Sequence, residues 1–344
     1  MKKNIIHVFW SFTKGGSEYL VKEITENSPS SISHSVIVIN NHYDINLINA
    51  FDKNIKFSMI NRQPKSYNLS WVIKFINSII LVPNRVIHCH NYSLIYLVWI
   101  FFKTPKFLTI HGFDNRLKKY RLFDEIICVS LPLSNYVENT FFLKTRTILN
   151  GVDNKMIKTK NNFNDKIKLL FVGRFDDYTK GLDVLIKAIN ILVSSGNDIH
   201  LTIIGKGTKQ AEFIDYIELN GLKQHISFKG LVSRNILYNL LCDYDVSVIP
   251  SRKESFSLFA VESMMAKVPI IVSDVPGLSE ISGNHSFIFE SENIDHLSSC
   301  ISKVVTEIKN NKISQRTNAS YNYAISNYNL KQMLDNYYKL YNSL

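Results

Sequence analysis

The chain has 344 residues, of which 45% are hydrophobic, and carries a formal net charge of +11 at pH 7. This length suits two domains of roughly 150 residues each, and the hydrophobic content can fill two cores. With only 13 Gly and 8 Pro, the composition excludes a fibrous or largely disordered protein.

Targeting signals are not apparent in the sequence. The first residues lead directly into a strand-like run, Ile5–Phe9, and the most apolar stretch, Leu94–Phe102, is far shorter than the roughly 20 residues that span a bilayer. The four cysteines have no metal-binding spacing, which favours reduced, buried thiols. They are Cys89, Cys128, Cys242 and Cys300. These features predict a cytoplasmic protein.

The positive charge is concentrated in the first half. Residues 1–150 contain 18 Lys and Arg against 9 Asp and Glu, whereas the remainder contains 22 against 20. A basic first half can attract nucleic acid, anionic lipid or a phosphorylated acceptor, and the alternative interpretation is an ordinary solvated basic surface.

The first half alternates short apolar runs with segments of helical length, which predicts a parallel sheet with helical crossovers. The expected strands are Ile5–Phe9, Ser35–Ile39, Val86–His88, Phe107–Ile110 and Glu125–Val129, and the clearest helices are residues 18–26, 71–82 and 92–103.

The pattern breaks near Asn150–Asp153 and then restarts, which indicates a domain boundary and a second α/β unit. Its expected strands are Lys168–Gly173, His200–Ile204, His225–Phe228, Val246–Ile249 and Pro269–Val272, and its helices lie near 181–195, 208–220, 234–241, 258–266 and 293–309. Residues 318–344 have helical spacing and are expected to cap this domain or to cross back to the first.

The most informative segment runs from Pro250 to Ala266 and follows a predicted strand. Its apolar spacing predicts a helix that begins near Ser257–Phe259, where unpaired N–H groups favour an anion such as diphosphate. Glu254 lies in the preceding loop and Glu262 in the second turn, and a carboxylate is a natural acceptor for a sugar or ribose diol. The purely structural alternative is that Glu254 stabilises the helix start and Glu262 pairs on the surface.

Two cations, Arg174 and Lys180, follow the first strand of the second domain. Together they can neutralise the charge that grows on a departing diphosphate, although two solvated basic residues in a loop would have the same pattern. Gly205, in Gly205-Lys206-Gly207, follows the next strand and is expected to form a tight turn.

In the first domain, Gly15 and Gly16 follow the first strand and open a helix, so that the backbone can approach a phosphate or a sugar. His111 ends a strand and can hydrogen-bond a sugar hydroxyl as a neutral imidazole. His88 and His90 are expected to pack or to support the site, because no carboxylate or cysteine pattern completes a metal site around them.

Taken in order, these motifs resemble family 4 retaining glycosyltransferases of the GT-B fold. The resemblance rests on Gly15–Glu18, His111-Gly112, Asn150–Asp153, Val172–Arg174, Lys180-Gly181, Gly205–Gly207, the Glu254/Glu262 pair, Pro269–Gly277 and Glu280. The loop Ser255–Leu258 departs from the family in lacking glycine. The resemblance implies two Rossmann-like domains that face a central cleft, with a C-terminal helix that crosses back to the first domain.

The resemblance also implies a role for each site residue. Arg174 and Lys180 would hold the diphosphate, Glu254 the hydroxyls of the donor sugar, and Glu262 the ribose. The remaining expected contacts are backbone amides at Ser257, Leu258 and Phe259, close approach of Gly16 and Gly205 to the donor, and His111 on the donor sugar. No metal and no cofactor are expected.

The predicted domains are an acceptor-binding domain, residues 1–155 with a helix at about 325–344, and a donor-binding domain, residues 156–324. The expected donor is a nucleotide diphosphate sugar, a UDP-sugar before a GDP-sugar. The expected acceptor is a saccharide or undecaprenyl-linked saccharide of bacterial capsule, O-antigen or lipopolysaccharide. Peripheral contact with the anionic inner face of the plasma membrane is a further expectation, based on the basic balance, the Leu94–Phe102 run and a basic cluster, namely Arg116, Lys118, Lys119 and Arg121.

Three alternatives remain at this point. A nucleotide-sugar epimerase of the same fold would need no acceptor, and a non-catalytic subunit could bind the nucleotide sugar without transferring it. A nucleic-acid-binding protein is suggested by the sequence pI of about 9.3, but the basic and aromatic residues do not alternate as in known modules, so no nucleic-acid partner is expected.

Overall fold

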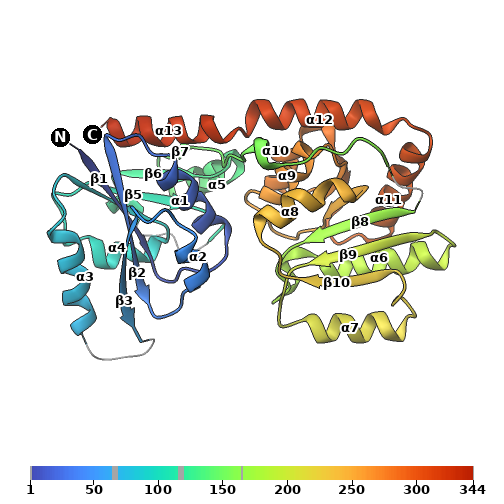
Figure 1. The fold of residues 1–344 in the computed structure, drawn as a ribbon, viewed down its shortest axis with the longest axis horizontal. Coiled ribbons are helices and arrows are strands. Elements are labelled where there is room, and N and C mark those ends of the chain that lie inside the picture. Colours follow the sequence, from blue (N-terminus) through green and yellow to red (C-terminus); the bar gives the residue numbers. More distant parts are fainter. Residues whose placement is uncertain (1, 64–68, 115–119, 164–165, 344) are drawn as a thin grey trace. The chain divides into compact units, whose positions relative to one another are not determined.

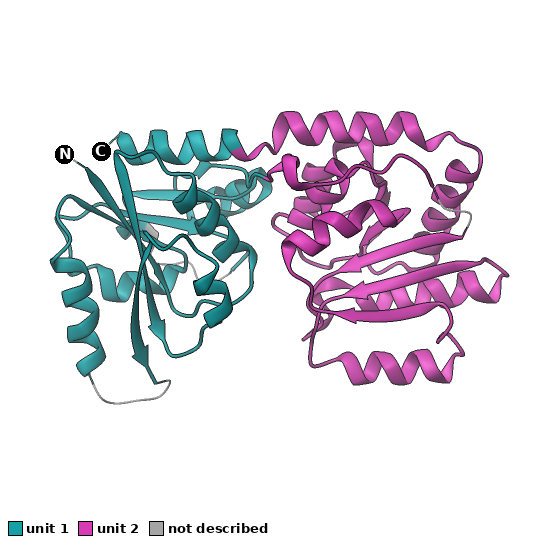
Figure 2. Ribbon diagram, in the orientation of Figure 1, with its two compact units in different colours: residues 1–151, 331–344 teal, residues 152–330 magenta. Residues whose placement is uncertain are grey.

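The computed structural model describes residues 2–63, 69–114, 120–163 and 166–343. The chain divides into two compact units, with residues 1–151 and 331–344 in unit 1 and residues 152–330 in unit 2 (Figure 2). Unit 1 is therefore discontinuous in sequence, because the chain returns to it after unit 2.

Unit 1 is built on a seven-stranded parallel sheet with the order β3-β2-β1-β4-β5-β6-β7 in the described residues. Its strands are β1 (Lys3–Phe9), β2 (Ile32–Asn40), β3 (Lys56–Arg62), β4 (Arg85–Cys89), β5 (Lys106–Ile110), β6 (Glu125–Cys128) and β7 (Arg146–Thr147). The helices are α1 (Gly16–Glu26), α2 (Ile45–Asn49), α3 (Ser70–Ile80), α4 (Ile95–Val98), α5 (Leu131–Phe141) and α13 (Leu330–Asn342) (Figure 1). All five residues of β5 are buried, as expected for a central strand of a parallel sheet that helices cover on both faces.

Unit 2 has a six-stranded parallel sheet with the order β10-β9-β8-β11-β12-β13 in the described residues. The strands are β8 (Ile167–Val172), β9 (Ile199–Ile204), β10 (Ile226–Gly230), β11 (Val246–Ile249), β12 (Ile270–Ser273) and β13 (Phe287–Phe289). The helices are α6 (Leu182–Ser194), α7 (Gln210–Leu219), α8 (Arg234–Leu240), α9 (Leu258–Met265), α10 (Pro276–Ser282), α11 (Ile294–Lys309) and α12 (Ile313–Asn327). One hydrophobic core joins β8 and β9 to α6 and α11.

The helix α13 completes unit 1 from the far end of the chain. Tyr337 and Tyr341 are fully buried, and the Tyr341 hydroxyl lies 2.7 Å from Nδ1 of His88 on β4. The Tyr338 hydroxyl donates to the Ile24 carbonyl oxygen of α1 at 2.8 Å. The C-terminal segment thus belongs to the core of unit 1, as the resemblance to the GT-B fold implied, and does not cap the sheet of unit 2.

Most predicted elements are present at nearly the same bounds, but the helix expected over residues 92–103 is wrong. The chain is helical there only as a 3-10 turn, Tyr92–Leu94, followed by α4. Pro105 disfavours a helical conformation at Thr104, and β5 begins at Lys106, so turns replace the end of the expected helix. In the described ranges, no helix combines the length and the apolar composition that crossing a bilayer requires.

Candidate active site in unit 2

The candidate site of unit 2 lies between β8 and β11, where successive strands change the side on which they extend the parallel sheet. From β8 the chain continues through β9 to β10 on one side, and then β11, β12 and β13 extend the sheet on the other side. The loops after β8 and β11 therefore diverge at neighbouring strand ends, which is where open parallel sheets bind ligands.

An ion pair joins these two loops. Nζ of Lys180, after β8, lies 2.5 Å from Oε2 of Glu254, after β11. The Glu254 side chain is 10% exposed and that of Lys180 32% exposed. The hydroxyl of Ser251 also lies 3.5 Å from the same carboxylate oxygen. Two of the predicted site residues, 74 positions apart in sequence, are thus in direct contact.

Backbone contacts that require glycine hold these loops together. Gly181 has φ of +68°, and a Cβ atom there would lie 1.8 Å from the Pro250 carbonyl oxygen. Gly277, in α10 after β12, passes the Glu254 backbone so closely that a Cβ atom would lie 2.2 Å from the Glu254 oxygen. These contacts fix the backbone on either side of the Lys180–Glu254 ion pair.

Gly205, after β9, also allows a close backbone contact between two loops. Its φ is +146°, and a Cβ atom would lie 1.9 Å from the carbonyl oxygen of Gly173. The sequence predicted a tight turn at this position, and the structure shows that the turn packs against the loop that carries Arg174.

Arg252 holds the two loops from the side, a role that the sequence analysis did not predict. Its guanidinium binds both carboxylate oxygens of Asp183 at 2.8 Å and donates to the Tyr178 carbonyl oxygen at 2.6 Å. Its Nε lies 2.7 Å from Glu292. The hydrogen bonds to Asp183, and secondarily the neighbouring charges, raise the pKa of Arg252. A bidentate arginine of this kind fixes geometry as well as charge, so Arg252 positions the loop that carries Lys180.

Arg174 follows β8 and is exposed to solvent. With the described residues its side chain makes no hydrogen bond and no ion pair. The hydrogen bonds from Thr179 lower the pKa of Asp177, and the charges of Arg174 and Lys180 contribute to the shift. The loop after β8 therefore presents one fixed cation, Lys180, and one solvated cation, Arg174.

The helix α9 begins where the sequence predicted. The Ser257 hydroxyl accepts from the N–H of Ala260 at 3.3 Å and so caps the helix. In the described part of the chain, no hydrogen bond engages the N–H groups of Leu258 and Phe259. These two groups lie four and five residues after Glu254, and together with the helix dipole they favour an anion at this position.

Glu262 is buried rather than paired on the surface. It lies in α9, is 3% exposed, and forms an ion pair through Oε1 with Arg234. The Tyr238 hydroxyl lies 3.4 Å from the same oxygen. Arg234 opens α8 just after β10, and this position at a strand end was the available signal for a residue that the sequence analysis missed.

In unit 1, Gly16 opens α1 after β1, with Gly15 at the cap position. The Glu18 carboxylate accepts from the Thr13 N–H at 3.2 Å and from the Ser17 hydroxyl at 2.7 Å, so this loop is held by its own side chains. His111 directly follows β5, is half-buried, and has Nε2 3.2 Å from Nδ1 of His90. Burial lowers the pKa of His111 to about 4, which keeps the imidazole neutral.

The two parallel-sheet units define a GT-B fold. The crystal structure of a glycosyltransferase from Rickettsia africae aligns with 99% of this chain and 98% of its own, with a TM-score of 0.83 and 18% sequence identity. The complex of Anabaena HepE with UDP and glucose aligns over 99% of both chains, with a TM-score of 0.82 and 16% identity.

The family model described as glycosyl transferases group 1 matches residues 153–321, which lie within unit 2. An uncharacterised glycosyltransferase of Methanocaldococcus jannaschii is 30% identical over 227 residues, which are 62% of this chain and 61% of that protein. The match therefore spans less than two thirds of that relative's length.

Proposed function

We propose that the chain is a retaining, family 4 glycosyltransferase that transfers a sugar from a nucleotide diphosphate donor to a saccharide acceptor. A UDP-sugar is the favoured donor and a GDP-sugar the other candidate. The observation that carries the proposal is the Lys180–Glu254 ion pair, which joins the loops after the central strands β8 and β11. Glu254 lies in the loop that leads directly into α9. In this arrangement a cation and a carboxylate lie in contact close to a helix start, and this supports binding of a sugar diphosphate.

The diphosphate would be held by positive charge from three sources. Lys180 and Arg174 supply side-chain cations, and the N–H groups of Leu258 and Phe259, beside the Ser257 cap, supply backbone donors. Such fixed donors stabilise charge that develops on a leaving group. With this set of donors, we propose that catalysis requires neither a metal ion nor a cofactor.

The two carboxylates would bind hydroxyls at opposite ends of the donor. Glu254, already held by Lys180, would accept hydrogen bonds from the transferred sugar. Glu262 would accept from the ribose diol through Oε2, while Arg234 holds Oε1. Arg234 keeps the buried Glu262 carboxylate oriented before the nucleotide arrives.

The transfer step needs no covalent intermediate on the protein. The bond between the anomeric carbon and the diphosphate oxygen breaks, and the acceptor hydroxyl oxygen bonds to the same carbon from the same face. The acceptor's proton passes to the leaving phosphate oxygen. Lys180 and Arg174 stabilise the diphosphate as it departs.

For unit 1 we propose acceptor binding, together with two contacts to the donor. The first contact is Gly16, at the start of α1, which would approach a phosphate. In unit 2, Gly205 would line the donor site in the turn beside Arg174. The second contact of unit 1 comes from a histidine. His111, a neutral imidazole, would hydrogen-bond the transferred sugar.

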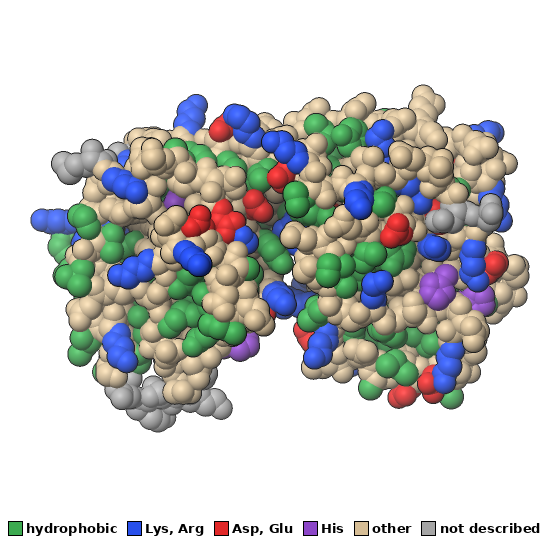
Figure 3. Space-filling view, viewed as in Figure 1, with side chains coloured by type: hydrophobic (Ala, Val, Ile, Leu, Met, Phe, Trp, Pro, Cys, Tyr) green, Lys and Arg blue, Asp and Glu red, His purple; other side chains and the backbone are tan. Residues whose placement is uncertain are grey.

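The proposed acceptor is a lipid-linked saccharide of a bacterial surface polysaccharide, reached at the inner face of the plasma membrane. Supporting this, the segment Leu94–Phe102 exposes Tyr96, Trp99 and Phe102, and exposed aromatic and apolar side chains suit an interfacial contact. Of the basic cluster, Arg121 is exposed, whereas Arg116, Lys118 and Lys119 lie outside the described residues. On the face seen in Figure 3, Lys and Arg side chains are scattered and not gathered in one patch.

Membrane contact is testable by cosedimentation with phosphatidylglycerol vesicles at low salt. The wild type should bind, and W99S/F102S should bind less. Equal sedimentation of both forms, or none by the wild type, would remove the membrane part of the proposal.

The donor site is testable by a thermal-shift screen with UDP, GDP, ADP, CMP, TDP and their sugar conjugates, without added metal. A ligand at about 100 times its dissociation constant should stabilise the fold by about 2.7 kcal/mol. Glu262→Ala should weaken binding by about 1.5–3 kcal/mol through the lost charged hydrogen bonds. Product analysis separates transfer from epimerisation of the donor, and binding without turnover would favour a non-catalytic subunit.

A further inference from the structure

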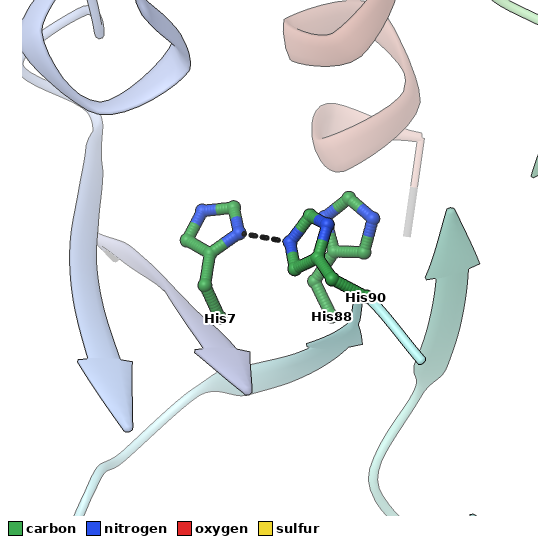
Figure 4. Close-up of side chains that lie close together, drawn as sticks. All are labelled: His7, His88 and His90. Carbon is green, nitrogen blue, oxygen red and sulfur yellow. Dashed lines mark hydrogen bonds between the residues drawn. The ribbon is translucent and has the colours of Figure 1, made fainter. Parts of the chain in front are cut away.

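Four histidines form a continuous line across the sheet of unit 1. They come from neighbouring strands, with His34 on β2, His7 on β1, His90 just after β4 and His111 just after β5. The distances between bonded nitrogens are 3.1 Å from His34 to His7, 3.0 Å from His7 to His90 and 3.2 Å from His90 to His111. Figure 4 shows the contact between His7 and His90.

The rings meet edge to edge and not face to face. Their centroids are 5.3, 5.3 and 5.4 Å apart in the same order, with interplanar angles of 18°, 26° and 28°. When two ring nitrogens are about 3 Å apart, the ring centroids are farthest apart if both nitrogens lie on the line that joins the centroids. The observed centroid distances are close to this maximum, so the bonded nitrogens lie near that line. This is the geometry of hydrogen bonds within a row of nearly parallel imidazoles.

Each ring uses its two nitrogens in the same sense along the row. His34, His7 and His90 each direct Nδ1 toward the His111 end and Nε2 toward the other end, and His111 receives through Nε2. Beyond His34, Nε2 lies 2.8 Å from the hydroxyl oxygen of Ser28, a half-buried residue. The row therefore runs from the Ser28 hydroxyl to Nδ1 of His111.

Burial keeps these rings neutral. It lowers the pKa of His34 and of His111 to about 4, and lowers the pKa of His7 and His90 well below the usual value. A neutral imidazole has one N–H and one acceptor nitrogen. Each bond in the row needs one donor and one acceptor, so all four rings must adopt the same tautomer.

A metal ion is the competing interpretation of part of this cluster. Ligand nitrogens of His7, His88 and His90 lie within 4.8 Å of one another. However, both nitrogens of His88 have partners, the Tyr341 hydroxyl and the Thr109 hydroxyl, each at 2.7 Å. Coordination by all three would break hydrogen bonds on every ring, so the row explains the observed contacts better.

We propose that His34, His7 and His90 are positioning residues, which couple the tautomer of His111 to their own and relay protons between it and Ser28. The role in turnover rests on the proposed function, because it assigns His111 to the donor sugar. When Nδ1 of His111 takes up a proton from water, each ring passes its Nε2 proton to Nδ1 of the neighbouring ring on the Ser28 side. His34 passes its Nε2 proton to the Ser28 hydroxyl oxygen, and this half-buried hydroxyl releases its own proton to solvent. All four rings stay neutral and change tautomer together, so no charge remains in the core.

The tautomers can be measured directly, without any substrate, by long-range ¹H–¹⁵N correlation spectra of protein with ¹⁵N-labelled histidine. In the wild type we expect the same tautomer for His34, His7, His90 and His111. Two different tautomers among these four rings would overturn the proposal. Stoichiometric Zn²⁺ binding that shifts His7, His88 and His90 together would overturn it in favour of a metal site.

Substitution then tests the coupling. His7→Phe interrupts the row without touching His111, and should change the tautomer populations of His90 and His111. The matched control is His88→Asn, a buried histidine of the same cluster outside the row, which should leave them as in the wild type. If His7→Phe does not fold, His34→Asn removes the last imidazole of the row, which contacts both His7 and Ser28. An unchanged His111 in the folded variant would refute the coupling.

Kinetics separate this proposal from the proposed function. With the identified donor, His7→Phe should lower kcat at least about tenfold and leave the donor KM within about twofold, whereas His88→Asn should change neither. A common tautomer in a protein that transfers no sugar would retain the relay and refute the function. Transfer activity in a protein whose four rings have different tautomers would retain the proposed function and refute the relay.

Discussion

Lys180 and Glu254, from the loops after the two central strands of unit 2, form an ion pair with Nζ and Oε2 2.5 Å apart. Removing one partner leaves the other without its counter-charge, and the Glu254 side chain is 10% exposed. Lys180→Met and Glu254→Gln should each destabilise the protein, and the double variant should cost less than the sum. We expect a coupling free energy of about 0.5–3 kcal/mol in urea unfolding. Strict additivity would mean that the pair contributes nothing.

Gly181 and Gly221 allow a matched comparison, because both have φ of +68°. Gly221 has no atom within 4 Å of an added Cβ, whereas at Gly181 that atom would lie 1.8 Å from the Pro250 carbonyl oxygen. Gly221→Ala should cost about 1 kcal/mol of unfolding free energy, from backbone strain alone. Gly181→Ala should cost clearly more and weaken nucleotide binding, as measured by calorimetry. Equal effects would show that the loop contact with Pro250 is unimportant.

Arg252→Lys should be a damaging change despite the retained charge. A lysine cannot reproduce the two parallel hydrogen bonds to Asp183. The loop that carries Lys180 is then no longer held in place by the bidentate contact. We expect a loss of about 1–3 kcal/mol in unfolding free energy together with weaker nucleotide binding. Lys223→Ala, which removes the exposed ion pair with Glu218, is the control and should cost less than about 1 kcal/mol.

The buried histidines of unit 1 should make that unit acid-labile. Burial lowers the pKa of five of them, and the printed values are about 4 for His34 and His111 and about 3 for His88. Their pKa values are depressed in the folded state, so the unfolded chain binds more protons below pH 6.5. Stability should therefore be complete above pH 6.5 and be lost as the pH falls toward 4.

Each such histidine contributes at most about 1.4 kcal/mol per pH unit in this range. The three tryptophans, Trp10, Trp71 and Trp99, all lie in unit 1, so urea unfolding followed by their fluorescence reports on this unit. His34→Asn should reduce the slope of unfolding free energy against pH by up to the contribution of one histidine. A flat profile between pH 6.5 and 5 would contradict the burial of neutral rings.

The central strands of unit 2 were predictable because they are continuous apolar runs, each followed by a polar motif, but their order in the sheet was not predicted. The strands β3, β7 and β13 were not predicted, and all three lie at sheet edges. An edge strand is less buried, so its sequence carries less of the apolar signal: β3 reads Lys56–Arg62, with polar residues at both ends and in the middle.

The site could be predicted only one loop at a time. Spacing after a strand indicated Lys180, Glu254 and Glu262 separately, but no local pattern states that Lys180 touches Glu254. Arg252 and Arg234 were missed for the same reason, since their partners lie 69 and 28 positions away. The histidine row is the extreme case, because it depends on the order of four strands and not on any motif.

The discontinuity of unit 1 has a consequence during synthesis on the ribosome. Unit 2 is contiguous and can fold once residue 330 has emerged, whereas the N-terminal part of unit 1, made first, lacks the buried Tyr337 and Tyr341 until the last helix arrives. Until then His88 lacks its Tyr341 partner, and the face that α13 covers stays open to water. The portion of the chain translated first is therefore the portion that completes its fold last.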